Sequence, residues 1–215
     1  MQQIQSVKMN YNIEELQGKK KVVSAADIMN MQFDVYQFQE QYKQIFGEPA
    51  KSFLSMIYGS KGSGKSTYAL EFADYFARNN FGKVVYFSLE EGISKSFQNK
   101  MILNNITGNI DISEERSTKE IKKQSQSYSL VIIDSVNTAD LNDEDIGFIT
   151  AYRKMYNTSF LLVLQATKGG DYKGDSGIVH DCDIVLRAEN KEIFVEKNRY
   201  ANNTDNSYKI KAFNQ

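Results

Sequence analysis

Between residues 52 and 200, short runs that are apolar throughout alternate with longer amphipathic stretches. Runs without polar positions are typical of strands buried on both faces of a parallel sheet. We expect such strands at residues 53–58, 84–89, 130–134, 160–164 and 183–187. The stretches between them repeat apolar residues at helical spacing. This alternation predicts an α/β fold in three layers, with a mostly parallel central sheet between helices.

The two ends of the chain follow other patterns. Segments 192–196 and 208–212 resemble shorter strands joined by Asn- and Asp-rich turns, which favours antiparallel strands at one sheet edge. Ser24 followed by Asp27 is typical of a helix start. A helix ending at Gly47 is predicted by the apolar positions Val35, Phe38, Tyr42 and Ile45.

Composition adds limits to this picture. A length of 215 residues suits one domain, which we place at residues 51–215, with residues 1–50 as an extension, a linker or an oligomerisation arm. The 26 basic and 27 acidic residues nearly balance, which argues against a chain that coats nucleic acid along its whole surface. The single cysteine, Cys182, fits a reducing compartment such as the cytoplasm, and no apolar run is long enough for a membrane span.

The strongest motif directly follows the first predicted strand. It reads Gly59-Ser60-Lys61-Gly62-Ser63-Gly64-Lys65-Ser66 and matches the phosphate-loop pattern G-x-x-x-x-G-K-[ST] in full. Glycines let the backbone N–H groups curl around a phosphate, and the following helix points its positive N-terminus at the same anion. Lys65 is suited to the β- and γ-phosphates and the Ser66 hydroxyl to Mg²⁺. The motif, with Thr67 after it, predicts a site for ATP and Mg²⁺.

Carboxylates end two other predicted strands. Asp134 closes the run at 130–134 and is expected to hold Mg²⁺ through water, although a lone aspartate there is also typical of a turn. Glu90 and Glu91 follow the strand at 84–89, at the edge where open α/β sheets place their sites. Either glutamate is suited to orient an attacking water, and the pattern leaves open which one does so.

Several segments together resemble a known family. The sequence Phe87-Ser88-Leu89-Glu90 resembles the segment that carries the catalytic glutamate in replicative helicases of the DnaB family. Four further segments resemble the RadA/Sms branch of the RecA-like ATPases: residues 132–135, 165–170, 180–186 and 196–200. The resemblance covers about residues 52–200. The chain departs from the family in having Ala201 where the Lys-Asn-Arg-Phe-Gly signature ends in Gly, and in lacking a zinc-binding cysteine cluster.

This resemblance implies a RecA-like P-loop core and roles for named residues. Glu90 would be the general base, and Gln165 would sense the γ-phosphate. Lys197 and Arg199 would reach the nucleotide of a neighbouring subunit in a ring or filament of identical chains. Other interpretations stay open, since Gln165 also fits a polar strand end and Lys197 to Arg199 also fit an exposed turn.

Two functions of different classes follow from these features. The first is Mg²⁺-dependent ATP hydrolysis by an oligomer that acts on single-stranded DNA, with replication, recombination or repair proteins as partners. The glycine-rich loop at 167–177, with Lys168, Tyr172 and Lys173, would contact the DNA. The alternative is an ATP-gated switch or scaffold that hydrolyses slowly and recruits proteins. A small-molecule phosphotransferase is a third reading, weakened by the lack of an Arg-rich lid.

Overall fold

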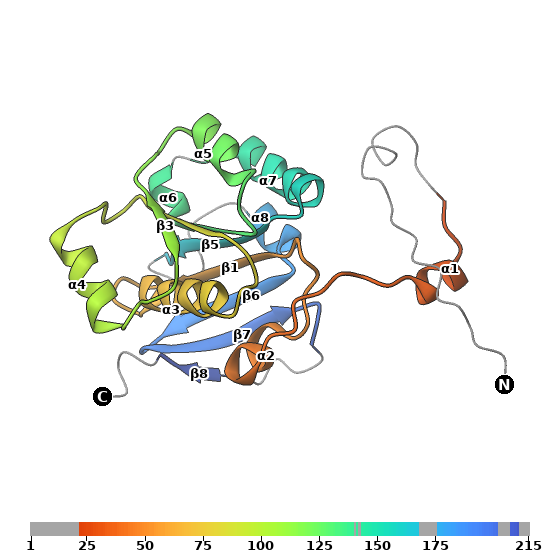
Figure 1. Ribbon diagram of the computed structural model, residues 1–215, viewed down its shortest axis with the longest axis horizontal. Helices are drawn as coiled ribbons and strands as arrows, with labels where there is room; N and C mark the ends of the chain where they lie inside the picture. The colour runs from red at the N-terminus through yellow and green to blue at the C-terminus, as the bar shows by residue number, and fades with distance from the viewer. Residues whose placement is uncertain (1–21, 140, 142, 168–175, 202–206, 211–215) are drawn as a thin grey trace. The chain divides into compact units, whose positions relative to one another are not determined.

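The computed structural model describes residues 22–139, 141, 143–167, 176–201 and 207–210. The chain divides into two compact units, Met1–Asp34 and Val35–Gln215 (Figure 1). In the first unit, α1 (Ala25–Asn30) begins as the sequence predicts, because the Ser24 hydroxyl accepts a hydrogen bond from the Asp27 N–H at 3.1 Å. No residue of α1 is buried.

The second unit is built on one eight-stranded sheet with the order β3-β2-β4-β5-β1-β6-β7-β8. The first six strands in this order run parallel, and β7 and β8 are antiparallel at one edge. The strands are β1 (Leu54–Gly59), β2 (Val84–Ser88), β3 (Ile110–Ser113), β4 (Leu130–Asp134), β5 (Ser159–Gln165), β6 (Ile184–Glu189), β7 (Glu192–Asn198) and β8 (Ser207–Lys209). This arrangement confirms the predicted mostly parallel sheet with antiparallel edge strands.

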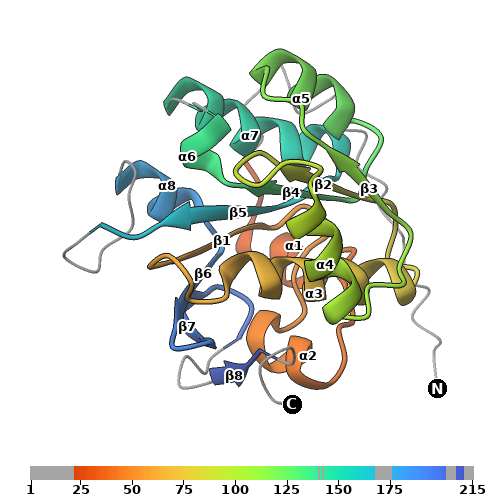
Figure 2. The ribbon, with the colours of Figure 1, turned by 90° about the vertical axis from the view of Figure 1, so that its left-hand side faces the viewer.

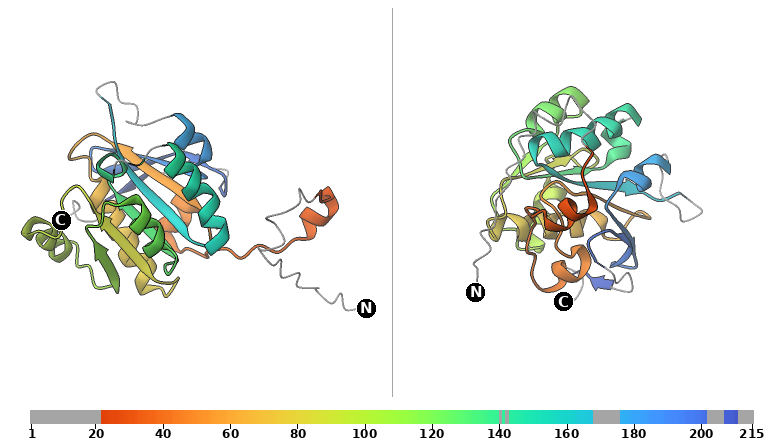
Figure 3. Two further views of the ribbon diagram at one scale, coloured as in Figure 1. Left: turned by 90° about the horizontal axis from the view of Figure 1, so that it is seen from above. Right: turned by 90° about the vertical axis from the view of Figure 1, so that its right-hand side faces the viewer.

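Helices cover both faces of the sheet and form two separate hydrophobic cores. One core joins the sheet to α2 (Glu40–Phe46), α3 (Lys65–Arg78) and α4 (Lys95–Leu103). The other joins it to α5 (Thr118–Ser125), α6 (Val136–Ala139), α7 (Asp143–Tyr156) and α8 (Ser176–Asp181). Neighbouring residues of one strand face different cores, as Ile57 and Tyr58 do, because side chains alternate across a strand. Figures 2 and 3 show the two helix layers on opposite faces.

The segment before the first strand differs from its prediction. Only Tyr42 and Ile45 of the four expected positions lie on α2, whereas Val35 pairs with Ala50 in an isolated β-bridge. Tyr36 and Phe38 are buried and alternate with exposed neighbours, which is the period of an extended strand rather than a helix. The prediction of one helix across these residues was therefore wrong, although the helix does end at Gly47.

Residues 35–50 belong to the same compact unit as the sheet. Their aromatic rings pack against α3: the centroid of Phe46 lies 4.4 Å from that of Phe72, and Tyr36 lies 5.0 Å from Phe76. The boundary between the two compact units falls after Asp34. Within the described residues, no helix combines the length and the hydropathy that crossing a membrane requires.

Candidate functional site

The phosphate-loop motif connects the carboxyl end of β1 to the start of α3. Gly59 is required by close packing, because a Cβ there would lie 2.2 Å from the carbonyl oxygen of Ala188 on β6. Gly64 precedes the helix with φ of +103°, a conformation that side-chain-bearing residues rarely adopt. The loop therefore turns sharply against the sheet and leads directly into the N-terminus of α3.

Lys65 is buried at the first position of this helix. Its Nζ donates hydrogen bonds to the carbonyl oxygens of Gly59, at 2.9 Å, and Ser60, at 2.8 Å. An ammonium group has three N–H bonds, so one is left for a ligand. Burial lowers the pKa of Lys65, although the charges of Asp134 and Glu90 favour its protonated form.

Asp134 ends β4 behind the loop and is itself buried. The Tyr86 hydroxyl donates to its Oδ2 at 2.5 Å, and the Ser66 hydroxyl donates to the same carboxylate. Burial raises the pKa of Asp134, although these two hydrogen bonds favour the charged form. A hydroxyl and a carboxylate are hard oxygen ligands, so Ser66 and Asp134 have the chemistry to hold Mg²⁺ together with phosphate oxygens.

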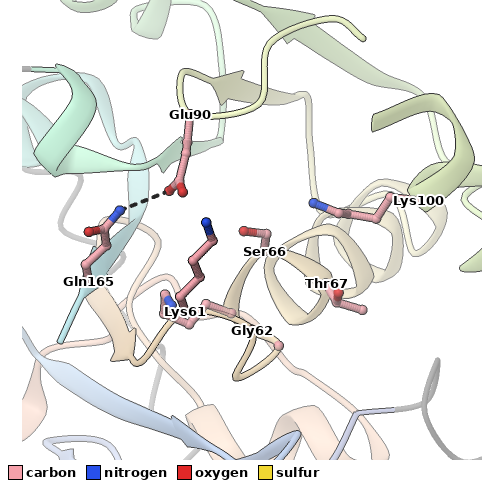
Figure 4. A pocket seen from close by; sticks show the side chains of 9 residues that line it. Lys61, Gly62, Ser66, Thr67, Glu90, Lys100 and Gln165 are labelled. Atoms are coloured by element: carbon pink, nitrogen blue, oxygen red, sulfur yellow. Dashed lines mark hydrogen bonds between the residues drawn. The ribbon is translucent and has the colours of Figure 1, made fainter. Parts of the chain in front are cut away.

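Glu90 and Glu91 are held differently, although they are adjacent. The carbonyl oxygen of Asp134 accepts N–H bonds from Leu89, at 2.7 Å, and Glu90, at 3.2 Å, which fixes the turn after β2. The Glu90 side chain accepts a hydrogen bond from Gln165 Nε2 at 3.4 Å (Figure 4). Glu91 instead forms an ion pair with Lys100.

The ion pair also sets the ionisation of Glu91. Burial alone would raise the pKa of this carboxylate, but hydrogen bonds from Lys100 and Ser96 outweigh that effect and lower it. Glu90 lines the cavity above the phosphate loop, whereas Glu91 does not. Of the two glutamates, Glu90 is therefore the one that a ligand in this cavity would meet.

A cavity of about 260 Å³ lies above the phosphate loop (Figure 4). Its lining combines the loop, the start of α3, the end of β2, α4 and the end of β5: Lys61, Gly62, Gly64, Lys65, Ser66, Thr67, Glu90, Lys100 and Gln165. Gly59, Ser60 and Ser63 belong to the loop but do not line the cavity. The cavity therefore brings together most of the residues that the sequence singled out, from three strands distant in the chain.

Lys100 is the lining residue that the sequence analysis missed. It lies on α4, three positions after the buried Phe97. Residues three apart share one side of a helix, so the side that buries Phe97 also turns Lys100 toward the sheet. The spacing of Phe97 and Lys100 was the one signal in the sequence for Lys100. It points to the cavity only when the packing of α4 against the sheet is known.

Lys197 and Arg199 lie away from this cavity. Lys197 donates to the carbonyl oxygens of Val179, at 2.8 Å, and His180, at 3.1 Å, at the end of α8. Arg199 pairs with Asp183 at 3.1 Å. In the register of β6, Asp183 lies five residues before Ala188, the partner of Gly59, which corresponds to about 16 Å along the strands.

Burial lowers the pKa of Lys197, and the nearby charge of Arg199 adds to the effect. Both residues are therefore engaged at the amino edge of the parallel strands within their own chain. The predicted DNA loop cannot be placed in the same way, because its residues 168–175 lie outside the described part of the chain.

No known family profile matches the chain. It is similar to DNA repair protein RadA from two strains of Helicobacter pylori, at 30% identity over 159 residues and 28% over 207 residues. These matches cover 66% and 88% of this chain but 35% and 46% of the relatives. RadA of Chlamydia muridarum is 26% identical over 63% of this chain and 33% of its own length. The chain thus spans between a third and a half of these curated relatives.

Two solved structures share the fold. One is the flagellar accessory protein FlaH from Methanocaldococcus jannaschii, with a TM-score of 0.61 and 13% identity, covering 84% of this chain and 96% of FlaH. The other is a KaiC-like protein from Pyrococcus horikoshii, with a TM-score of 0.64 and 17% identity, covering 81% and 94% of the two chains. The sheet order, the phosphate loop and these similarities together identify the chain as a RecA-like P-loop ATPase core.

Proposed function

We propose that this chain binds ATP with Mg²⁺ and hydrolyses it in the cavity above the phosphate loop. The observation that carries this proposal is the meeting of Lys65 and Ser66 with Glu90 and Gln165 around one cavity. A phosphate loop alone is suited to bind a nucleotide. The carboxylate of Glu90 opposite the loop adds a group that can accept a proton from water.

In the proposed reaction, the oxygen of a water molecule bonds to the γ-phosphorus, and the bond from that phosphorus to the β-phosphate oxygen breaks. Glu90 takes the proton of the attacking water, and ADP leaves with the bridging oxygen. Lys65 stabilises the charge on the phosphate oxygens, and Gln165 holds Glu90 through its amide. Mg²⁺, held by Ser66 and Asp134, would supply further positive charge at the phosphates.

We further propose that the protein works as an oligomer on single-stranded DNA. The support is the similarity to relatives named DNA repair proteins, together with the Lys-Asn-Arg segment. In an oligomer, Lys197 and Arg199 would approach the neighbour's nucleotide. Both would then exchange their contacts with the end of α8 for contacts with phosphate oxygens.

A switch that recruits a protein partner is the second candidate. Helix α4 carries Lys100 into the cavity and also exposes Ile102 and Leu103, which are 62% and 70% accessible. A nucleotide that displaced Lys100 from Glu91 would therefore move a helix with an apolar surface. The structural neighbours FlaH, a flagellar accessory protein, and the KaiC-like protein support this reading at the level of the fold.

The rate of ATP hydrolysis with and without single-stranded DNA, at low and physiological salt, tests these proposals. Lys65→Ala is the reference variant, and its rate should fall to background because the phosphates lose their buried ammonium group. Equal rates in wild type and Lys65→Ala would refute hydrolysis at this site. Stimulation by DNA that fades with salt supports the DNA-directed ATPase, whereas a slow rate unaffected by DNA favours the switch.

A further inference from the structure

The three lysines that line the cavity differ in what they contact. Lys65 donates to two carbonyl oxygens of the phosphate loop, and Lys100 pairs with Glu91. Lys61, at the third position of the motif, has no hydrogen bond or ion pair with any residue that the structure describes. It is exposed, and Glu90 and Gln165 line the same cavity. The loop thus presents an additional ammonium group beside the groups proposed to activate water.

The backbone next to Lys61 leaves this side chain room to move. A Cβ added at Gly62 would meet nothing within 4 Å, so the tip of the loop faces open space. An exposed lysine on an ordinary surface loses side-chain entropy when it is fixed and gains little from a single contact. A phosphate group held by the same loop changes that balance, because charge-assisted hydrogen bonds are about twice as strong as neutral ones.

We propose that Lys61 is a catalytic residue that binds the γ-phosphate of ATP within its own chain. This inference rests on the proposed ATP hydrolysis and adds a residue to it. Lys61 Nζ would donate a hydrogen bond to an oxygen of the γ-phosphoryl group and stay protonated throughout. The proton of the attacking water still goes to Glu90, and the bond to ADP breaks as before.

The contact would strengthen in the transition state if Lys61 lay beside the oxygens of the transferring phosphoryl group, over which negative charge is spread. The contacts at the amino edge of the sheet explain why a cation from the same chain would be needed in the cavity. Lys197 and Arg199 are bound to α8 and Asp183 in their own chain, so they are not available to their own cavity. Lys61 would supply a cation from its own chain, so its contribution to hydrolysis would not depend on a neighbour.

The test compares Lys61→Gln with Lys61→Arg, which keeps the charge, and with Lys119→Gln. Lys119 is exposed on α5 and does not line the cavity, so its variant controls for the loss of one surface charge. We measure kcat and KM for ATP, and the affinity for ADP, over a tenfold range of protein concentration. We expect kcat of Lys61→Gln to fall about 100-fold at every concentration, with partial recovery in Lys61→Arg.

The affinity for ADP separates this role from a structural one. ADP lacks the γ-phosphate, so its affinity should stay within about twofold in Lys61→Gln, whereas a distorted loop would weaken it. A kcat of Lys61→Gln equal to that of an active wild type overturns the inference and leaves the proposed function intact. A loss of kcat that is accompanied by an equal loss of ADP affinity also overturns it. Absence of hydrolysis in the wild type overturns both.

Discussion

The central sheet has a carboxyl edge, where its parallel strands end, and an amino edge, where they begin. The two carry similar charged side chains in different arrangements. At the carboxyl edge, Lys61, Lys65 and Glu90 line a cavity. At the amino edge, Asp183 accepts hydrogen bonds from Arg153 at 2.5 Å, from Arg199 at 3.1 Å and from the Leu54 N–H at 3.0 Å. Charges at the first edge face a space that a ligand can fill, whereas those at the second face one another.

The two buried aspartates, one at each edge, differ in the partners of their carboxylates. Asp134 receives hydroxyl groups from Tyr86 and Ser66, and its burial raises the pKa. Asp183 receives two guanidinium groups, each with a full positive charge. A buried carboxylate without a cation is costly, and one with paired cations is held in place. The contrast supports the proposal that Asp134 holds Mg²⁺, and it predicts that Asp183 stabilises the fold.

The largest expected effect is at the carboxyl edge. Glu90→Gln removes the proposed proton acceptor but keeps the shape of the side chain. We expect kcat for ATP to fall by about 10²- to 10⁴-fold, while ATP binding and the free energy of unfolding change little. Steady-state hydrolysis and a nucleotide titration measure the two parts separately.

Glu91→Gln is the matched control for this variant. It breaks the ion pair with Lys100. Both side chains of this pair are about one quarter exposed, so the loss in the free energy of unfolding should stay under about 1 kcal/mol. The expected change in kcat is only a few-fold. If Glu91→Gln loses turnover and Glu90→Gln keeps it, the assignment of the two glutamates is reversed.

The next effect is at the amino edge. Asp183→Ala leaves Arg153, whose side chain is 7% exposed, without its buried partner. Breaking such a pair costs about 3–5 kcal/mol of the free energy of unfolding. Denaturant unfolding measures this loss, and the ATP affinity of the folded fraction should not change. Asp111→Ala removes an exposed aspartate on β3 and should cost less than about 0.5–1 kcal/mol.

An unchanged free energy of unfolding in Asp183→Ala would show that the amino-edge cluster does not hold the fold together. A loss of ATP affinity with unchanged stability would reverse the functional contrast between the two edges.

How far the sequence predicts this molecule depends on how local each signal is. The central strands are predicted because they are apolar at most positions. The loop at 59–66 is predicted because its residues are contiguous in the sequence. The strand Ile110–Ser113 was missed, since its alternating residues are only partly buried at the sheet edge. Val35 and Phe38 were assigned to a helix because they lie seven and four residues before Tyr42, which is helical spacing, although both precede the start of α2.

Parts of the site that depend on packing were less accessible to sequence reasoning. Lys100 joins the cavity only because α4 lies beside β2, and no motif marks it. The contacts of Lys197 and Arg199 with α8 and Asp183 also depend on the antiparallel register of β7 with β6. A motif identifies residue types, whereas their partners depend on the three-dimensional arrangement.

The smallest predicted effect contrasts the two aspartates directly. Asp134→Asn removes a buried charge that is hydrogen-bonded to hydroxyl groups and forms no ion pair with a described residue, so we expect the unliganded protein to gain about 1 kcal/mol of unfolding free energy at pH 7. Because the folded-state pKa of Asp134 is raised, protonation favours the folded state. The advantage of the variant should therefore shrink as pH falls from 7 through that raised pKa toward the ordinary value of an aspartate, about 3.9. Thermal unfolding across this range measures the gap, and addition of Mg²⁺ with ATP should stabilise wild type more than Asp134→Asn. Destabilisation by Asp134→Asn, as expected for Asp183→Ala, would mean that both aspartates serve the fold and that the contrast between the edges is wrong.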